Sequence, residues 1–178
     1  MQLKKQIETL FRPLIGQKAW GASVGWGSFV TVEFGSKHLY HRHYHGDWHL
    51  WLYQCDWSLN SNGRCLADSE SKRKVIQLAI DNLNGSKLTH FSFDSQRAIT
   101  EFVFDNHLDL RCKPYAEAAP DEDYWILFMP DRQVASLRKS GLKYEPMDGV
   151  APAPLVERKK QEIEIHTAGV RRQIRLED

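Results

Sequence analysis

The stretch over residues 38–49 holds the residue types best suited to chemistry in this chain. It contains five of the eight histidines and one carboxylate, Asp47. If the stretch is extended, alternate residues share a face, so His41, His43 and His45 point to the same side. Imidazoles together with a carboxylate can bind zinc or another first-row ion, and an open coordination position can activate water. The sequence therefore predicts a candidate metal site at His41, His43 and His45, which would support a metal-dependent enzyme.

The same loop also has the composition of a protein-binding surface. Its histidine spacing matches no established zinc signature, and Arg42 and Tyr44 lie among the imidazoles. Tyrosine, tryptophan and arginine side chains are enriched at the hot spots of protein interfaces. We therefore predict that the loop and a basic C-terminal tail contact another protein. The predicted binding residues are Tyr40, Arg42, Tyr44, Trp48, Arg171 and Arg172.

Other classes of function receive less support from the sequence. Aromatic and basic side chains of this kind also bind unpaired nucleotides. However, acidic residues are scattered through both the loop and the C-terminal tail, and no RNA-binding signature is present. The net charge of +1 produces no global field that would favour nucleic acid. No serine-hydrolase elbow, phosphate-binding glycine loop or HExxH motif occurs. No catalytic residue is predicted, and His49 is interpreted as a hydrogen-bonded core histidine.

Length and composition indicate a soluble protein with one core. A chain of 178 residues can form one domain plus an extension. The longest apolar runs fall short of the roughly 20 residues that cross a bilayer, so no membrane contact is expected. The three cysteines form no CxxC pair, which favours reduced thiols and a cytoplasmic location.

Two expected strands bracket the histidine loop. Residues 28–34 alternate between apolar and polar positions, which predicts a strand. Residues 48–57 are apolar on both faces, so we predict one central strand that is covered on both sides. Residues 35–46 are then a long hairpin connection. The glycine-rich residues 20–27 predict a bulged strand or a tight turn.

The remaining elements predict an α+β fold. Apolar residues at helical spacing indicate a helix over residues 2–12. A second helix is expected to begin at an N-cap on Asp68 or Ser69 and to end near Gly85. Hairpin-length links between the strands favour antiparallel pairing. We expect a mostly antiparallel sheet of about six or seven strands packed against two helices. The further strands are predicted at residues 88–93, 98–104, 108–112, 124–129 and 134–137.

The composition changes after Pro146. Residues 1–146 are expected to form the globular domain, and residues 147–178 a linker with a charged extension that has the pattern of a β-ribbon. An isolated ribbon is marginal in water, so it would pack on its own domain or support a homodimer. The favoured function is a small, non-enzymatic, protein-binding domain of the inhibitor, antitoxin-like or regulatory kind. A metal-dependent enzyme and a single-stranded nucleic-acid binder are the alternatives.

Overall fold

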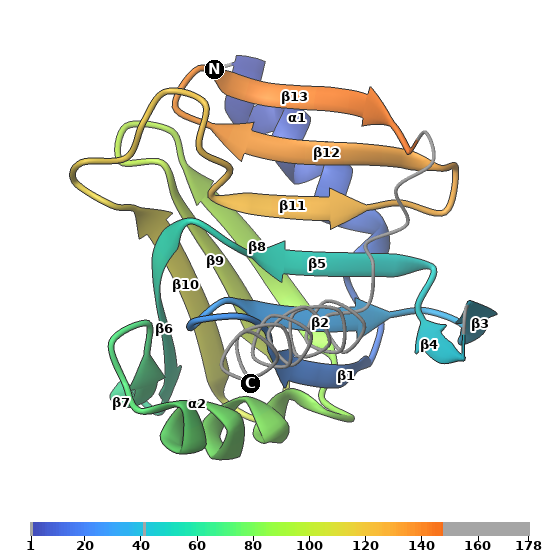
Figure 1. Cartoon of the computed structure of the whole chain (residues 1–178), viewed down its shortest axis with the longest axis vertical. Helices are drawn as coiled ribbons and strands as arrows, with labels where there is room; N and C mark the ends of the chain where they lie inside the picture. Colours follow the sequence, from blue (N-terminus) through green and yellow to red (C-terminus); the bar gives the residue numbers. More distant parts are fainter. Residues whose placement is uncertain (1, 41, 148–178) are drawn as a thin grey trace, which may run out of the picture. The chain divides into compact units, whose positions relative to one another are not determined.

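The computed structural model describes residues 2–40 and 42–147, with only the backbone of Tyr40 (Figure 1). This part of the chain is rich in antiparallel sheet and contains two α-helices, which agrees with the expected class at a coarse level. The expectation of a single sheet is wrong, because the strands divide into three sheets. The expected extension, with Arg171 and Arg172, lies outside the described residues except for Met147.

The strands of each sheet follow in their spatial order. The six-stranded sheet is β1 (Ala19–Val24), β2 (Val30–Phe34), β5 (Trp48–Leu52), β11 (Trp125–Phe128), β12 (Gln133–Arg138) and β13 (Gly141–Pro146). The five-stranded sheet is β7 (Arg64–Asp68), β6 (Cys55–Ser61), β10 (Leu108–Pro114), β9 (Ile99–Phe104) and β8 (Leu88–Asp94). The two-stranded sheet is β3 (His38–Tyr40) and β4 (His43–His45). The helices are α1 (Gln2–Phe11) and α2 (Arg73–Ile80), each followed by a 3-10 turn, Arg12–Leu14 and Asp81–Leu83.

The chain passes from one large sheet to the other between β5 and β6, where a single strand over residues 48–57 was predicted. In β5 the buried apolar residues are Leu50 and Leu52, whereas in β6 they are Cys55, Trp57 and Leu59. The buried apolar positions therefore change from even to odd numbers, and one regular strand cannot bury both sets on one face. The apolar pattern marks a strand that bends and changes sheets, not one that is covered on both sides.

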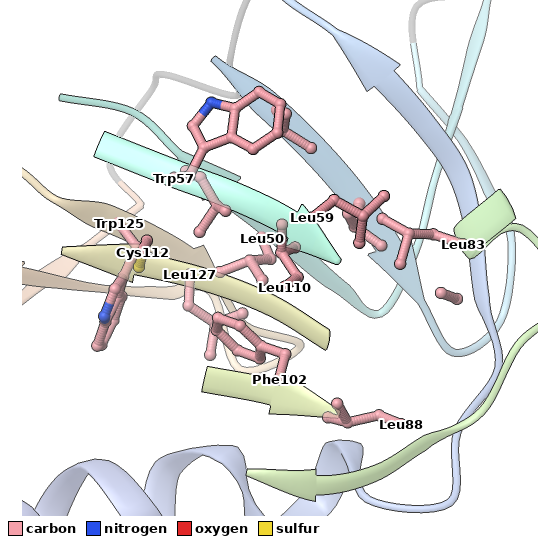
Figure 2. Packing of buried hydrophobic residues seen from close by; sticks show 14 of the residues in the cluster. Leu50, Trp57, Leu59, Leu83, Leu88, Phe102, Leu110, Cys112, Trp125 and Leu127 are labelled. Atoms are coloured by element: carbon pink, nitrogen blue, oxygen red, sulfur yellow. The ribbon is translucent and has the colours of Figure 1, made fainter. Parts of the chain in front are cut away.

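The core lies between the two large sheets, whose strands cross in Figure 1. Figure 2 shows side chains from both sheets meeting there, among them Leu50 and Leu127 from one and Phe102 and Leu110 from the other. A hydrogen bond of 3.1 Å from the indole Nε1 of Trp125 to Oγ1 of Thr100 joins the sheets inside this core. Burial of these apolar faces is the main stabilising contribution to the fold.

Both helices cover the edges of this core. Helix α1 was predicted correctly and packs against β8, where the ring of Phe11 stacks on Phe91 at 4.3 Å. Helix α2 begins at Arg73, so the predicted start at Asp68 or Ser69 is wrong. The carboxylate of Asp68 instead accepts hydrogen bonds from Ser71 Oγ and the Glu70 amide, which form a separate turn. Neither helix has both the length and the apolar character that spanning a membrane requires.

Candidate metal centre

Glu33 and His49 lie opposite each other on neighbouring strands. The register of β2 and β5 makes their Cα atoms direct partners. Side chains alternate along a strand, and Val32, Phe34 and Leu50 fill the core face, so Glu33 and His49 share the other face of the sheet. Both are nevertheless buried, with exposed fractions of 5% and 8%. The sheet therefore holds a carboxylate and an imidazole side by side with little access to water.

The β3–β4 hairpin brings a second imidazole to this pair. Gly35 has φ +82°, and at Gly46 a Cβ atom would lie 2.3 Å from the carbonyl oxygen of Phe34, so the chain can pass close to β2 only with glycine there. The amide of Gly46 donates a hydrogen bond of 2.8 Å to Oε2 of Glu33. The preceding residue, His45, is thereby held over the carboxylate of Glu33.

The three side chains form one compact group. Oε1 of Glu33 lies 3.3 Å from Nδ1 of His45 and 3.4 Å from Nε2 of His49. All three ligand atoms lie within 4.8 Å of one another. Within the part of the chain that the structure describes, no hydrogen bond joins Glu33 to either imidazole; Nε2 of His49 instead accepts one of 2.7 Å from the indole Nε1 of Trp51. Nε2 of His49 is therefore unprotonated, with its proton on Nδ1.

Burial sets the charge state of the group. Desolvation is the main cause that lowers the pKa of His49 to about 4, against the opposing effect of the Glu33 charge. The imidazole of His49 is therefore neutral near pH 7. Among residues 2–40 and 42–147, no lysine or arginine lies within ion-pair distance of Glu33. A buried carboxylate that no lysine or arginine neutralises is costly, so a bound cation would improve the electrostatics of this site.

Aromatic rings enclose the group on the sheet. The ring of Phe128 on β11 lies 5.7 Å from that of His49 and 5.1 Å from that of Trp51. Such surroundings limit water and strengthen the electrostatic interactions inside the group. Two histidines with one carboxylate are also the protein ligands of a well-known kind of catalytic zinc site.

The structure places the three predicted metal ligands differently from one another. His45 belongs to the group, whereas His43, two residues earlier on β4, does not. His41 lies outside the described residues. Asp47, the carboxylate noted in the sequence, contacts His38 at 2.6 Å and accepts a hydrogen bond from the Ser36 amide. These two hydrogen bonds, that of His38 first, lower the pKa of Asp47.

Glu33 and His49 were missed as partners of His45, although both strands were predicted. The register that makes them neighbours comes from the pairing of β2 with β5 across the intervening hairpin. A signal was present: each is a polar residue at an alternating position of a strand whose other face is apolar. Only the pairing of β2 with β5 shows that Glu33 and His49 lie side by side.

The predicted binding residues also separate into groups. Arg42 is exposed in the turn of the hairpin with φ 71°, and the side chain of Tyr44 is 61% exposed. Trp48 is half-buried and packs against the core. Tyr40 lies in β3, and Arg171 and Arg172 lie outside the described residues. Leu39, which was not predicted, is 65% exposed directly opposite Tyr44.

Neither the scan against protein-family models nor the searches of curated proteins and of solved structures found a match for this chain.

Proposed function

We propose that this protein binds one divalent transition-metal ion of the zinc class through Glu33, His45 and His49. The observation that carries the proposal is the distance from Oε1 of Glu33 to one nitrogen of each imidazole. Tetrahedral ligands that lie about 2.0–2.1 Å from zinc are separated from one another by about 3.3–3.4 Å. Oε1 of Glu33 lies at these separations from Nδ1 of His45 and Nε2 of His49, without hydrogen bonds to either.

The neighbouring groups support the same assignment. The Gly46 amide holds Oε2 of Glu33, which leaves Oε1 directed towards the two imidazoles. Hydrogen bonds of this kind orient metal ligands and tune their affinity. Three protein ligands leave one tetrahedral position open, as in catalytic rather than structural zinc sites. A water molecule bound there would have its pKa lowered towards 7, which is the basis of metal-assisted hydrolysis.

Elemental analysis and calorimetric titration of untagged protein with zinc chloride test the proposal. We expect about one ion per chain in the wild type. In E33Q, H45A and H49A the zinc affinity should fall by more than the roughly 10- to 100-fold that follows when a residue that only hydrogen-bonds to a metal ligand is changed. H43A is the matched control, because His43 lies on the same strand outside the group. If H43A lowered the zinc affinity strongly while H49A left it unchanged, zinc would be bound by the exposed histidines of the hairpin, which would contradict the proposal.

A second candidate function, protein binding, is supported by the β3–β4 hairpin. Leu39 and Tyr44 are cross-strand partners and are both largely exposed. An exposed tyrosine near an arginine, Arg42, is the composition of an interface hot spot, and Leu39 adds exposed apolar area to it. An inhibitor-, antitoxin-like or regulatory protein would use such a surface.

Affinity capture from cell extract with the L39S/Y44S variant tests this second function. We expect a bound protein to be lost in that variant and retained in V75S/L78S, which removes exposed apolar residues of α2 instead. Equal capture by both variants and the wild type would contradict a role for the hairpin.

A further inference from the structure

The β3–β4 hairpin has little stability of its own. Its two strands pair with each other through three residue pairs and belong to neither large sheet. In Figure 1 the hairpin projects beyond the ends of β2 and β5. A two-stranded hairpin alone is marginally stable in water, so its position depends on the contacts at its base.

Two carboxylates make those contacts. Asp47 contacts Nε2 of His38 on β3 at 2.6 Å and accepts a hydrogen bond from the Ser36 amide. Glu33 contacts the other side, through the Gly46 amide at 2.8 Å and Nδ1 of His45 at 3.3 Å. The link at Asp47 is a strong hydrogen bond, whereas the link between Glu33 and His45 lacks hydrogen-bond geometry. The imidazole of His45 is therefore the least restrained group among these contacts.

The three proposed metal ligands come from elements of unequal rigidity. Glu33 and His49 are paired inside the six-stranded sheet, while His45 is the last residue of β4. An ion bound by all three would connect the sheet to the hairpin through the imidazole of His45. We propose that the metal ion is a latch, which fixes the β3–β4 hairpin against the six-stranded sheet when it is bound.

This inference rests on the proposed metal site and adds a regulatory role to it. The latched hairpin presents Leu39 and Tyr44, its exposed cross-strand pair, in one orientation. Ordering a binding surface in advance reduces the entropy that a partner must remove on association. Metal occupancy would then control whether this surface is ready to bind a partner.

Hydrogen–deuterium exchange of the full chain, with zinc chloride or with EDTA, tests the latch. In the wild type we expect zinc to slow amide exchange over residues 37–46 by about tenfold or more, because exchange there follows local opening of the hairpin. H43A should show the same slowing. H49A should show none, although it retains every histidine of the hairpin itself. The core strand β9 serves as an internal reference and should not change.

A zinc titration of the same samples separates the two proposals. If zinc binds in a manner that requires Glu33 and His49 but exchange over residues 37–46 is unchanged, the latch is wrong and the metal site stands. If exchange slows equally in H49A, zinc is acting through hairpin histidines alone, and the latch is again wrong. If the wild type binds no zinc, the proposed function and the latch both fail.

Discussion

The indole Nε1 of Trp51 donates a 2.7 Å hydrogen bond to Nε2 of His49, the nitrogen that lies 3.4 Å from Oε1 of Glu33. This nitrogen has one lone pair, so an ion that binds it must displace the indole N–H. Trp51 is therefore a competitor for the same atom that we assign to the metal. Tryptophan fluorescence should consequently change as zinc is added.

The first prediction concerns that competition. W51F removes the donor, and since a neutral hydrogen bond contributes about 1 kcal/mol, zinc affinity should rise by about fivefold. Calorimetric titration of the wild type and W51F measures the change. Weaker binding in W51F would show that Trp51 supports the metal-bound arrangement rather than competing with it.

The second prediction concerns the stability of the metal-free protein at acidic pH. The pKa of His49 is about 4 in the folded protein and 6.5 as its ordinary value. The unfolded chain therefore binds more protons between these values, and stability falls as the pH decreases from about 6.5 to 4. His49 should contribute a loss of about 2–3 kcal/mol over this window.

Urea unfolding in EDTA at pH 7 and pH 4 measures this loss. The wild type should lose more stability than H49F, whose other titrating groups are the same. The missing hydrogen bond to Trp51 lowers the stability of H49F at both pH values and cancels in the comparison. Equal losses in the two proteins would show that His49 is not held neutral by burial.

The third prediction concerns the close passage of the chain at Gly46. In G46A the new Cβ atom would lie 2.3 Å from the Phe34 carbonyl oxygen, so the backbone must shift. The shift moves His45 away from Glu33, and zinc affinity should fall by at least about tenfold, as when ligand orientation is lost. S36A is the control, because it keeps the backbone amide that donates to Asp47 and Ser36 lies outside the metal group. Unchanged zinc binding in G46A would separate the metal site from the hairpin geometry.

The fourth prediction concerns the hydrogen bond that joins the two large sheets. Thr100 and Trp125 are both fully buried, so T100V leaves the indole N–H of Trp125 without its partner. An unsatisfied buried donor costs about 1–3 kcal/mol. Urea unfolding should show this loss for T100V and less than about 0.5 kcal/mol for T89V, an exposed threonine on β8. Equal effects would contradict a stabilising role for this bond.

Local sequence patterns predicted the elements whose signals are local. Helix α1, strand β2 and the hairpin strands β8, β9 and β10 appear where periodicity placed them. The glycine-rich residues 20–27 overlap strand β1, which has a bulge between Trp20 and Ser23. In each case the evidence lies within a few residues of the element itself.

The features that the sequence did not predict depend on contacts between residues that are far apart in the chain. The strand predicted over residues 48–57 bends because Tyr53 and Gln54 donate to the carbonyls of Tyr124 and Asp123, far along the chain. The metal group depends in the same way on the pairing of β2 with β5. A histidine-rich loop indicated the right chemistry, but only His45 of the predicted ligands reaches the buried carboxylate.

Anomalous diffraction at the zinc edge, from crystals of the zinc-soaked protein, tests the proposed metal site most directly. We expect one strong peak about 2.0–2.2 Å from Oε1 of Glu33, Nδ1 of His45 and Nε2 of His49. A peak bound only by exposed histidines of the hairpin, or no peak at saturating zinc, would contradict the proposed site.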